Sequence, residues 1–225
     1  MKTVSVAIDG PAGAGKSTIA RRLASQLGFR YVDTGAIYRT VAYFMDLWGV
    51  SPKDADGVNR YIDELAVGIE YDEDGLQHMI MNGMDVTGDI RTQDISQKAS
   101  LISAHACVRE MLLDMQRDLA KQYNVIMDGR DIGTVVLPKA TVKIFLTASA
   151  EVRAKRRCEE LLAKGQKAKY ETVLKEIQQR DYQDTHREIA PLKMARDSIK
   201  VDTSEMNVDE VVAAILKIVQ EKAGL

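Results

Sequence analysis

The sequence predicts an α/β fold with three layers, in which helices cover both faces of a five-stranded parallel sheet. Two observations favour this class. Short apolar runs alternate with helical patterns along the whole chain, which is typical of parallel sheets with crossover helices. A glycine-rich loop also joins the first apolar run to the first helical pattern. At 225 residues, the chain is expected to form one domain with an embellishment, or at most two small domains, because a single core serves up to roughly 250 residues.

The expected strands are short apolar runs that end at polar or glycine-containing turns. They occupy residues 3–8, 29–32, 124–128, 142–147 and 199–202. Helical periodicity, with apolar residues three and four positions apart, fills the segments between these strands. One expected helix follows the glycine-rich loop and ends near residue 27. The others span residues 35–48, 93–122, 150–164, 171–183 and 208–222.

One stretch breaks this alternation. Residues 67–71, 76–81 and 84–86 are short extended runs, and they are joined by Asp-Glu-Asp-Gly and by Asn82-Gly83. Both connections are typical of hairpin turns. We therefore expect residues from about 60 to 92 to form a small antiparallel insert carried on the parallel sheet. The alternative is an excursion of the chain that has no role in a site.

Charge and composition exclude several classes of protein. The chain has 31 lysines and arginines against 33 aspartates and glutamates, so its net charge of −2 argues against nucleic-acid or anionic-membrane partners. No apolar run approaches the roughly 18 residues of a membrane span. The first residues lack the pattern of a secretion signal, so a cytoplasmic location is expected. Two cysteines and three scattered histidines indicate neither a disulfide scaffold nor a metal cluster.

Residues 10–17, here called the phosphate loop, match the pattern G-x-x-x-x-G-K-[ST] between an expected strand and an expected helix. Glycines let the backbone turn its N–H groups around a phosphate, and the following helix N-terminus adds a positive dipole. Lys16 is expected to reach the β- and γ-phosphates, and Ser17 to ligate Mg²⁺. The expected ATP-binding residues of this segment are Gly10, Pro11, Ala12, Gly13, Ala14, Gly15, Lys16, Ser17 and Thr18.

The phosphate loop alone predicts only that a nucleoside triphosphate binds. A GTPase is disfavoured because the chain has no Asn-Lys-x-Asp segment, and a motor is disfavoured because the chain is short. A kinase and an ATP-dependent binding switch remain open.

Arginines outside the loop favour the kinase, because a kinase with a phosphorylated acceptor must hold two anions together. Several polar residues follow expected strands, where open parallel sheets bind their ligands. Asp128, at one strand end, is expected to organise Mg²⁺ or its waters. A solvated helix face is an alternative explanation for the arginines of residues 153–157. The candidates are Thr34, Arg39, Asp128, Arg130, Asp131, Arg153, Arg157, Arg180, Asp184 and Arg187.

These residues lie in segments that resemble the bacterial-type cytidylate (CMP/dCMP) kinases over essentially the whole chain. The segments are IDGPAGAGKST at residues 8–18, DTGAIYR at 33–39, IRTQ at 90–93, DGRDIGTVV at 128–136, KIFL at 143–146 and RDYQDTHREIAPL at 180–192. The fourth and sixth are specific to this family among nucleoside monophosphate kinases. Thr34 stands where many members have serine, so a hydroxyl is kept at that position.

The resemblance implies a P-loop kinase with three regions and a role for each candidate. A core (about 1–35, 110–150 and 185–225) would carry a monophosphate-binding region with the insert (about 36–109) and a short helical lid (about 150–170). Arg39, Arg130 and Arg187 would bind the acceptor phosphate, and Arg180 with Asp184 would hold the ribose. Ser100, Arg109 and Asp131 would contact the cytosine, whose N4 donor and N3 acceptor suit a carboxylate beside an arginine.

The implied reaction is in-line transfer of the ATP γ-phosphoryl group to CMP or dCMP. No general base is required, because the acceptor phosphate is largely ionised at neutral pH. The expected catalytic residues are Lys16, Asp128, Arg130 and Arg187, with Arg153 and Arg157 closing over the triphosphate. A monomer is expected. Two alternatives stay open: a kinase for UMP, AMP or a hydroxylated metabolite, and a nucleotide-sensing or nucleic-acid-associated switch.

Overall fold

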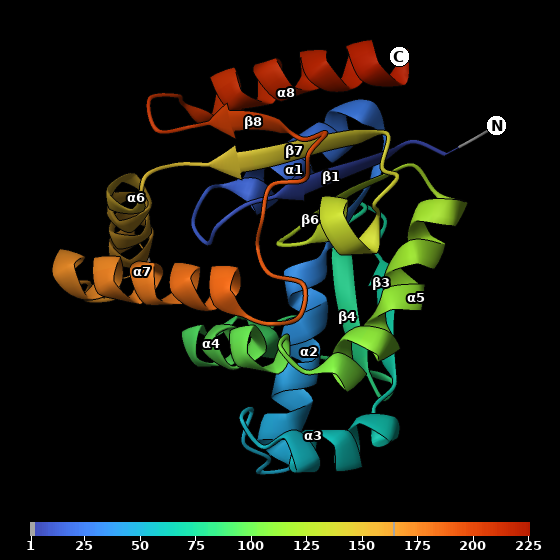
Figure 1. The fold of residues 1–225 in the computed structure, drawn as a ribbon, viewed down its shortest axis with the longest axis vertical. Coiled ribbons are helices and arrows are strands. Elements are labelled where there is room, and N and C mark those ends of the chain that lie inside the picture. The colour runs from blue at the N-terminus through green and yellow to red at the C-terminus, as the bar shows by residue number, and fades with distance from the viewer. Residues whose placement is uncertain (1–2, 164) are drawn as a thin grey trace.

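Five parallel strands form the central sheet of the computed structural model, which describes residues 3–163 and 165–225 (Figure 1). In spatial order they are β2 (Arg30–Asp33), β6 (Val125–Gly129), β1 (Ser5–Asp9), β7 (Val142–Thr147) and β8 (Ile199–Asp202). The parallel five-stranded sheet predicted from the sequence is confirmed, and each strand lies within two residues of its expected bounds.

Alternate residues of these strands face two separate cores. Val6 and Ile8 of β1 pack with α1 (Lys16–Leu27) and α8 (Val208–Ala223). Ala7, between them, faces α2 (Thr34–Leu47) and α5 (Ala106–Gln122) on the other side. Helices therefore cover both faces, as Figure 1 shows for α8 on one side and α2 and α5 on the other. The three-layer prediction is confirmed.

The predicted antiparallel insert is also present. It consists of β3 (Val67–Tyr71), β4 (Gln77–Met81) and the short β5 (Met84–Asp85). Asn82 and Gly83, both in the left-handed region at φ 48° and 84°, make the turn between β4 and β5. β4 packs against α2 and the edge strand β2, so the insert contacts the core at the point where β2 ends.

The single helix predicted over residues 93–122 is wrong. The structure has α4 (Gln93–Ile102) and α5, separated by Ser103, Ala104 and His105. His105 Nε2 lies 2.8 Å from the Pro52 carbonyl oxygen, and the Ser103 hydroxyl donates to the Ser100 carbonyl at 2.8 Å. These two contacts stabilise the interruption between α4 and α5. Helix α3 (Ala55–Tyr61), a π-helical turn over Ile132–Val136 and two short 3-10 helices, over Ile62–Glu64 and Asp89–Arg91, were not predicted.

Two helices stand beside the end of the sheet as a pair. α6 (Ala150–Ala163) and α7 (Tyr170–His186) share a small core of their own, formed by Ala154, Leu161, Val173 and Ile177. Residue 164, the last of the helix expected at 150–164, lies outside the described residues. None of the helices in the described part of the chain combines the length and the apolar character that a bilayer crossing requires.

Candidate active site

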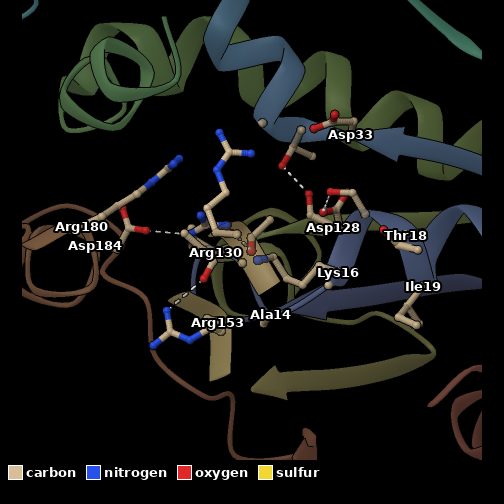
Figure 2. Close-up of a pocket in the computed structure, with 18 of the residues that line it drawn as sticks. Ala14, Lys16, Thr18, Ile19, Asp33, Asp128, Arg130, Arg153, Arg180 and Asp184 are labelled. Atoms are coloured by element: carbon tan, nitrogen blue, oxygen red, sulfur yellow. Dashed lines mark hydrogen bonds and ion pairs between the residues drawn. The ribbon is translucent and has the colours of Figure 1, made fainter. Parts of the chain in front are cut away.

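A cavity of about 790 Å³ opens beyond the carboxyl ends of β1, β2 and β6 (Figure 2). It brings together most of the predicted site residues, from the phosphate loop, the strand ends, α4, α6 and α7. Those that line it are Ala12, Gly13, Ala14, Gly15, Lys16, Ser17, Thr18, Thr34, Arg39, Ser100, Asp128, Arg130, Asp131, Arg153, Arg157, Arg180, Asp184 and Arg187. Gly10 and Pro11 are buried at the start of the loop, and Arg109 lines a smaller cavity of about 230 Å³ nearby.

The phosphate loop has a backbone that only glycine fits at its first position. A Cβ on Gly10 would lie 1.9 Å from the Leu146 carbonyl oxygen, on β7. Gly15, at φ 86°, is the residue directly before α1, so the loop turns straight into the helix N-terminus. Backbone N–H groups at a helix N-terminus and its dipole together favour an anion. The loop therefore has the geometry of a phosphate cradle.

Lys16 lies inside this cradle. Its Nζ donates a hydrogen bond to the Pro11 carbonyl oxygen at 2.7 Å, and the side chain is buried. Burial and the positive charge of Arg130 together lower the pKa of Lys16 to about 7. An anion next to Nζ would favour the charged ammonium, so a bound phosphate would raise the pKa of Lys16 and be attracted to its charge.

Asp128, at the end of β6, is the centre of a network of hydroxyl groups. Its carboxylate accepts hydrogen bonds from Ser17 Oγ and from the Tyr31 hydroxyl, each at 2.9 Å. Its carbonyl oxygen accepts from Thr34 Oγ1 at 2.7 Å. Burial and the negative charge of Asp33 raise the pKa of Asp128 to about 6. Ser17 and Asp128, each predicted to act on Mg²⁺ or its waters, are thus in direct contact.

Three guanidinium groups, here called the arginine cluster, face the loop from α2, from the residue directly after β6 and from α7. Arg39 pairs with Asp33 at 3.0 Å and Arg130 with Asp184 at 2.7 Å. Burial and the positive charge of Arg130 lower the pKa of Arg180, the third member, to about 10. Within residues 3–163 and 165–225, the buried Nε atoms of Arg39 and Arg180 have no hydrogen-bond partner. This excess of buried positive charge fits an anionic ligand.

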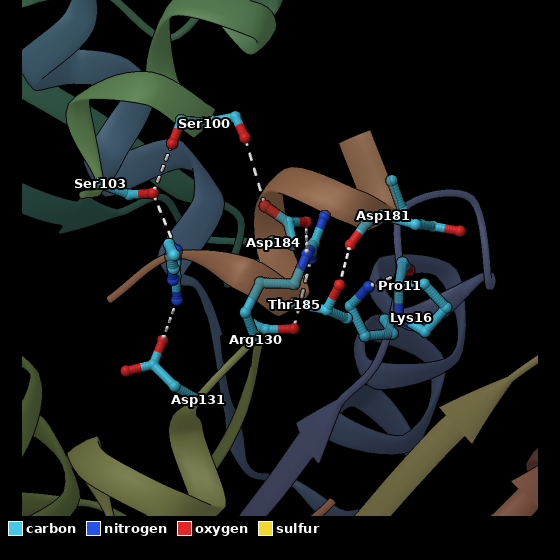
Figure 3. Close-up of polar contacts among 12 residues, drawn as sticks. Pro11, Lys16, Ser100, Ser103, Arg130, Asp131, Asp181, Asp184 and Thr185 are labelled. Atoms are coloured by element: carbon cyan, nitrogen blue, oxygen red, sulfur yellow. Dashed lines mark hydrogen bonds and ion pairs between the residues drawn. The ribbon is translucent and has the colours of Figure 1, made fainter. Parts of the chain in front are cut away.

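Asp131 lies between two arginines, and the three residues are here called the Asp131 group. Arg109 contacts one carboxylate oxygen, and Arg187 donates to the other at 3.2 Å. Arg187 also donates to Ser103 Oγ at 2.9 Å. Ser100, predicted to act with Asp131, donates to Asp184 at 3.2 Å instead (Figure 3). The break after α4 therefore supplies Ser103, which sequence analysis missed because it expected a continuous helix.

The two predicted arginines of α6 differ in their surroundings. Arg153 is buried, and it donates to the Ala12 carbonyl oxygen at 2.9 Å and to both carboxylate oxygens of Asp181. Arg157 is 35% exposed and pairs with Glu160 at 2.8 Å. The first links the phosphate loop to α7, whereas the second stays at the solvent side of the cavity.

Two further functional candidates were not predicted as site residues. Arg156 of α6 donates to the Thr203 hydroxyl and carbonyl oxygens at 3.1 and 2.6 Å. Asp9, at the end of β1, accepts from the N–H groups of Ile132 and Gly133 at 2.8 and 2.7 Å, which anchors the π-helical turn after Asp131. The signal for Arg156 was present, since it lies in the same run as Arg153 and Arg157. Strand-end position was the signal for Asp9.

Comparisons with known proteins assign the chain to a family. The family model "Cytidylate kinase" matches residues 6–221. A protein of Carboxydothermus hydrogenoformans named cytidylate kinase is 49% identical over 217 residues, which cover 96% of this chain and 97% of that protein. The Shouchella clausii protein of the same name is 46% identical over 220 residues, 98% of this chain and 97% of that one.

A comparison of structures agrees with this fold. A solved structure of an uncharacterized protein from Eubacterium ventriosum aligns with a TM-score of 0.52 at 14% identity, over 97% of this chain and 99% of that one. The likeness concerns the arrangement of strands and helices alone. On the sequence relatives and the family model, the chain belongs to the cytidylate kinase family.

Proposed function

We propose that this chain transfers the γ-phosphoryl group of ATP to CMP and dCMP, giving ADP and CDP or dCDP. The observation that carries the proposal is a single cavity in which the phosphate loop faces the arginine cluster and Asp131. Membership of the cytidylate kinase family supports the same reaction. A triphosphate and a monophosphate held together need several buried cations, and this cavity has them.

We assign the ATP phosphates to residues 10–18, with Arg153 and Arg157 closing over them from α6. Backbone N–H groups of the loop would bind the β-phosphate. The ammonium of Lys16, now bonded to the Pro11 carbonyl, would turn toward the phosphate oxygens. Their charge would restore the protonated form that burial disfavours.

We assign the adenine to the far end of the cavity, where Met206 and Val211 contribute apolar lining. Arg156 lies beside this end, held by two hydrogen bonds to Thr203. A planar guanidinium of this kind can stack on a base while its edge stays hydrogen-bonded. This assignment supports a purine donor rather than a ligand that carries phosphates alone.

The oxygen donors beside the phosphate loop fit Mg²⁺, which we propose as the metal of the ATP complex. Among the described residues no group of three or more His, Cys, Asp or Glu could hold a metal ion, and Mg²⁺ bound through phosphates needs only one or two protein oxygens. Ser17 Oγ would be its direct protein ligand, and the Asp128 carboxylate would orient Ser17 or the metal's waters. When bound, Mg²⁺ neutralises charge on the phosphates.

We assign the acceptor phosphate to Arg39, Arg130 and Arg187, and the ribose hydroxyls to Arg180 with Asp184. The Nε of Arg39 has no hydrogen-bond partner among the described residues, and this supports the assignment because a phosphate oxygen would satisfy that donor. The pairing of Arg130 with Asp184 at 2.7 Å would keep the phosphate and ribose contacts in a fixed relation.

We assign the cytosine to Asp131 and Arg109, with Ser100 nearby. The N4 amino group of cytosine would donate to the Asp131 carboxylate, and N3 would accept from Arg109. Uracil has the reverse pattern at both atoms, so it would leave both groups unpaired. The buried contact between Asp131 and Arg109 supports a fixed orientation of this recognition pair.

In the reaction that we propose, no protein group takes a proton from the acceptor, because the phosphate of CMP is largely ionised at neutral pH. Lys16, Arg130 and Arg187 would stabilise the charge that spreads over the transferred phosphoryl group. Arg153 and Arg157 would exclude water, which would otherwise accept the phosphoryl group. The rate would therefore depend on positioning and on charge.

We further propose that residues of about 150–170 act as a lid and residues of about 36–109 as the monophosphate-binding region, on a core of about 1–35, 110–150 and 185–225. The small core of α6 and α7, which is separate from the two cores of the sheet, supports a lid that packs apart from the sheet. A cytoplasmic monomer without nucleic-acid or membrane partners stays a prediction, which light scattering of the purified protein would test for its oligomeric part.

Two other functions compete with this one: a kinase for UMP, AMP or a hydroxylated metabolite, and an ATP-dependent switch without turnover. Incubation with γ-³²P-labelled ATP and CMP separates them. Label recovered in CDP supports the proposal. Label in inorganic phosphate alone, or no transfer, favours the switch, and transfer only to another acceptor favours a different kinase.

A further inference from the structure

Strand β2 lies at the edge of the parallel sheet, with β6 on one side only. The N–H of Arg30 donates to the Asn124 carbonyl oxygen, on the side of β6. Backbone groups of successive residues alternate in direction along a parallel strand. Those of Tyr31 and Asp33 therefore point away from β6, toward the insert, and an edge strand leaves such groups in need of partners.

Side chains of the insert supply these partners. The Tyr71 hydroxyl of β3 donates to the Tyr31 carbonyl oxygen at 3.1 Å. At Asp33, the carboxamide of Gln77 on β4 makes two hydrogen bonds: Oε1 accepts from the Asp33 N–H at 2.7 Å, and Nε2 donates to the Asp33 carbonyl at 3.3 Å. Gln77 is 9% exposed. One buried side chain thus takes the place that a neighbouring strand would have at the end of β2.

The same Asp33 controls the start of α2 and one arginine of the cavity. Its carboxylate accepts from the Ala36 N–H at 2.8 Å, which caps the helix, and from Arg39 Nη2 at 3.0 Å. Arg39 lies one and a half turns into α2, and its position depends on this ion pair and on the helix that Asp33 caps. Gln77 holds the backbone of Asp33, and Asp33 holds Arg39.

We propose that Gln77 is a positioning residue for the acceptor-phosphate contact. It fixes the backbone of Asp33 and thereby the orientation of the Arg39 guanidinium, so the insert sets affinity for the monophosphate through one carboxamide. Gln77 itself does not line the cavity and touches no substrate in this account. The inference rests on the proposed function in one respect, because it takes Arg39 as a ligand of the acceptor phosphate.

The variant Gln77→Met tests this inference, since methionine has a similar volume and cannot make the two hydrogen bonds to Asp33. We expect the KM for CMP to rise roughly tenfold, as the loss of two hydrogen bonds predicts. The KM for ATP should change less than about twofold, because the phosphate loop is not connected to Gln77 by this path.

The matched control is Tyr71→Phe. It removes the other hydrogen bond between the insert and β2, at Tyr31, and leaves Asp33 and Arg39 as they are. The two variants should lose similar thermal stability, but Tyr71→Phe should keep the KM for CMP of the unaltered protein. Equal changes of KM in both variants would mean that the insert acts only as a structural support, and the inference would be overturned.

A double-mutant cycle tests the path through Arg39. In the Arg39→Ala background, Gln77→Met should add no further increase in the KM for CMP, because the group that it positions is gone. A further tenfold increase there would refute the path. A general loss of stability would accompany Gln77→Met in either background, so it cannot explain an increase in the KM for CMP that occurs only when Arg39 is present.

Binding of inorganic phosphate, followed by the NMR signal of Arg39 Nε–H, separates this inference from the proposed function. Weaker phosphate binding by Gln77→Met, with Tyr71→Phe unchanged, supports the inference even if the unaltered protein fails to phosphorylate CMP. If CMP is phosphorylated and both variants bind phosphate as the unaltered protein does, the proposed function stands and the inference fails.

Discussion

Arg153 and Asp181 form a two-point ion pair, with distances of 3.0 Å from Nη1 to Oδ1 and 2.6 Å from Nη2 to Oδ2. The same guanidinium donates to the Ala12 carbonyl oxygen of the phosphate loop at 2.9 Å. One buried side chain of α6 thus connects the loop with α7, the helix that carries Arg180 and Asp184. The two halves of the cavity are joined through this arginine.

Substitution of Arg153 should therefore affect ATP use strongly. We expect Arg153→Ala to lower kcat/KM for ATP by at least about 30-fold, because truncating one member of a buried charge pair costs about 2 kcal/mol or more. Arg157→Ala should lower it only several-fold, since Arg157 is more exposed and its pair with Glu160 is partly screened. Steady-state kinetics with varied ATP measure both. If neither variant changes turnover or ATP affinity, the closing role proposed for them is wrong.

Asp131→Asn should reduce the preference for cytosine. The amide keeps the shape of the side chain but removes the carboxylate that we assign to the N4 amino group. We expect kcat/KM for CMP to fall roughly 100-fold, as for a lost hydrogen bond to a charged group. The kcat/KM for UMP should fall less, because the two nucleotides share only the weakened contacts of residue 131 to Arg109 and Arg187.

The comparison for this change is Glu188→Gln, which removes an exposed carboxylate next to Arg187 and should leave both nucleotides unaffected. Competition between CMP and UMP in one reaction gives the ratio of their kcat/KM values directly. An equal loss for CMP and UMP in Asp131→Asn would contradict the assignment of Asp131 to the base.

The pH dependence of the free enzyme should show the depressed pKa of Lys16. Because burial lowers that pKa to about 7, the ammonium loses its proton as the pH rises through neutrality. We expect kcat/KM for ATP to fall roughly tenfold between about pH 7 and about pH 8.5, whereas kcat should fall later because bound phosphates hold the proton.

The acid side of the profile is less diagnostic, although the pKa of Asp128 is raised to about 6. Protonation below that pH would remove the charge that accepts the Ser17 hydrogen bond, but the substrate phosphates titrate in the same range. The alkaline side is therefore the test. A kcat/KM for ATP that stays flat up to about pH 9 would contradict the assignment of the charged Lys16 to phosphate binding.

Gly10→Ala should prevent the phosphate loop from forming. The added methyl group would overlap the Leu146 carbonyl oxygen, so the loop or β7 must shift. We expect loss of ATP binding together with a lowered melting temperature. Gly28→Ala is the control: Gly28 is left-handed at φ 65° with open space around it, so the change should cost only about 1 kcal/mol and spare ATP binding. Calorimetry of both variants measures their melting temperatures and their ATP affinities. Normal ATP affinity in Gly10→Ala would contradict the close approach of Gly10 to Leu146.

The loop and the strand ends were predictable because their signals are local. Residues 10–17 match a phosphate-loop pattern between a strand and a helix, and Asp128 lies next to the end of another strand. The motif located the loop, and the apolar run located the strand end. The parallel topology then predicts that strand ends meet at one edge of the sheet. The contact of Ser17 with Asp128, 111 residues apart, agrees with this reasoning.

Other parts of the site depend on tertiary packing and could not be predicted from local patterns. Nothing in Ser103, Ala104 and His105 breaks a helix by itself, since there is no glycine or proline, and the bond from His105 to Pro52 comes from a distant segment. The pair of Arg153 with Asp181 and the bonds from Gln77 to Asp33 likewise join separate elements. Sequence analysis therefore located the arginines but not the groups that orient them.

The most direct test of the central claim is release of ADP with MgATP against CMP, dCMP, UMP, AMP and no acceptor, under one set of conditions. The account predicts fast release with CMP and dCMP and slow release with the other nucleotides and with water. Release that does not depend on the acceptor, or no release with any acceptor, would contradict it and favour an ATP-dependent switch.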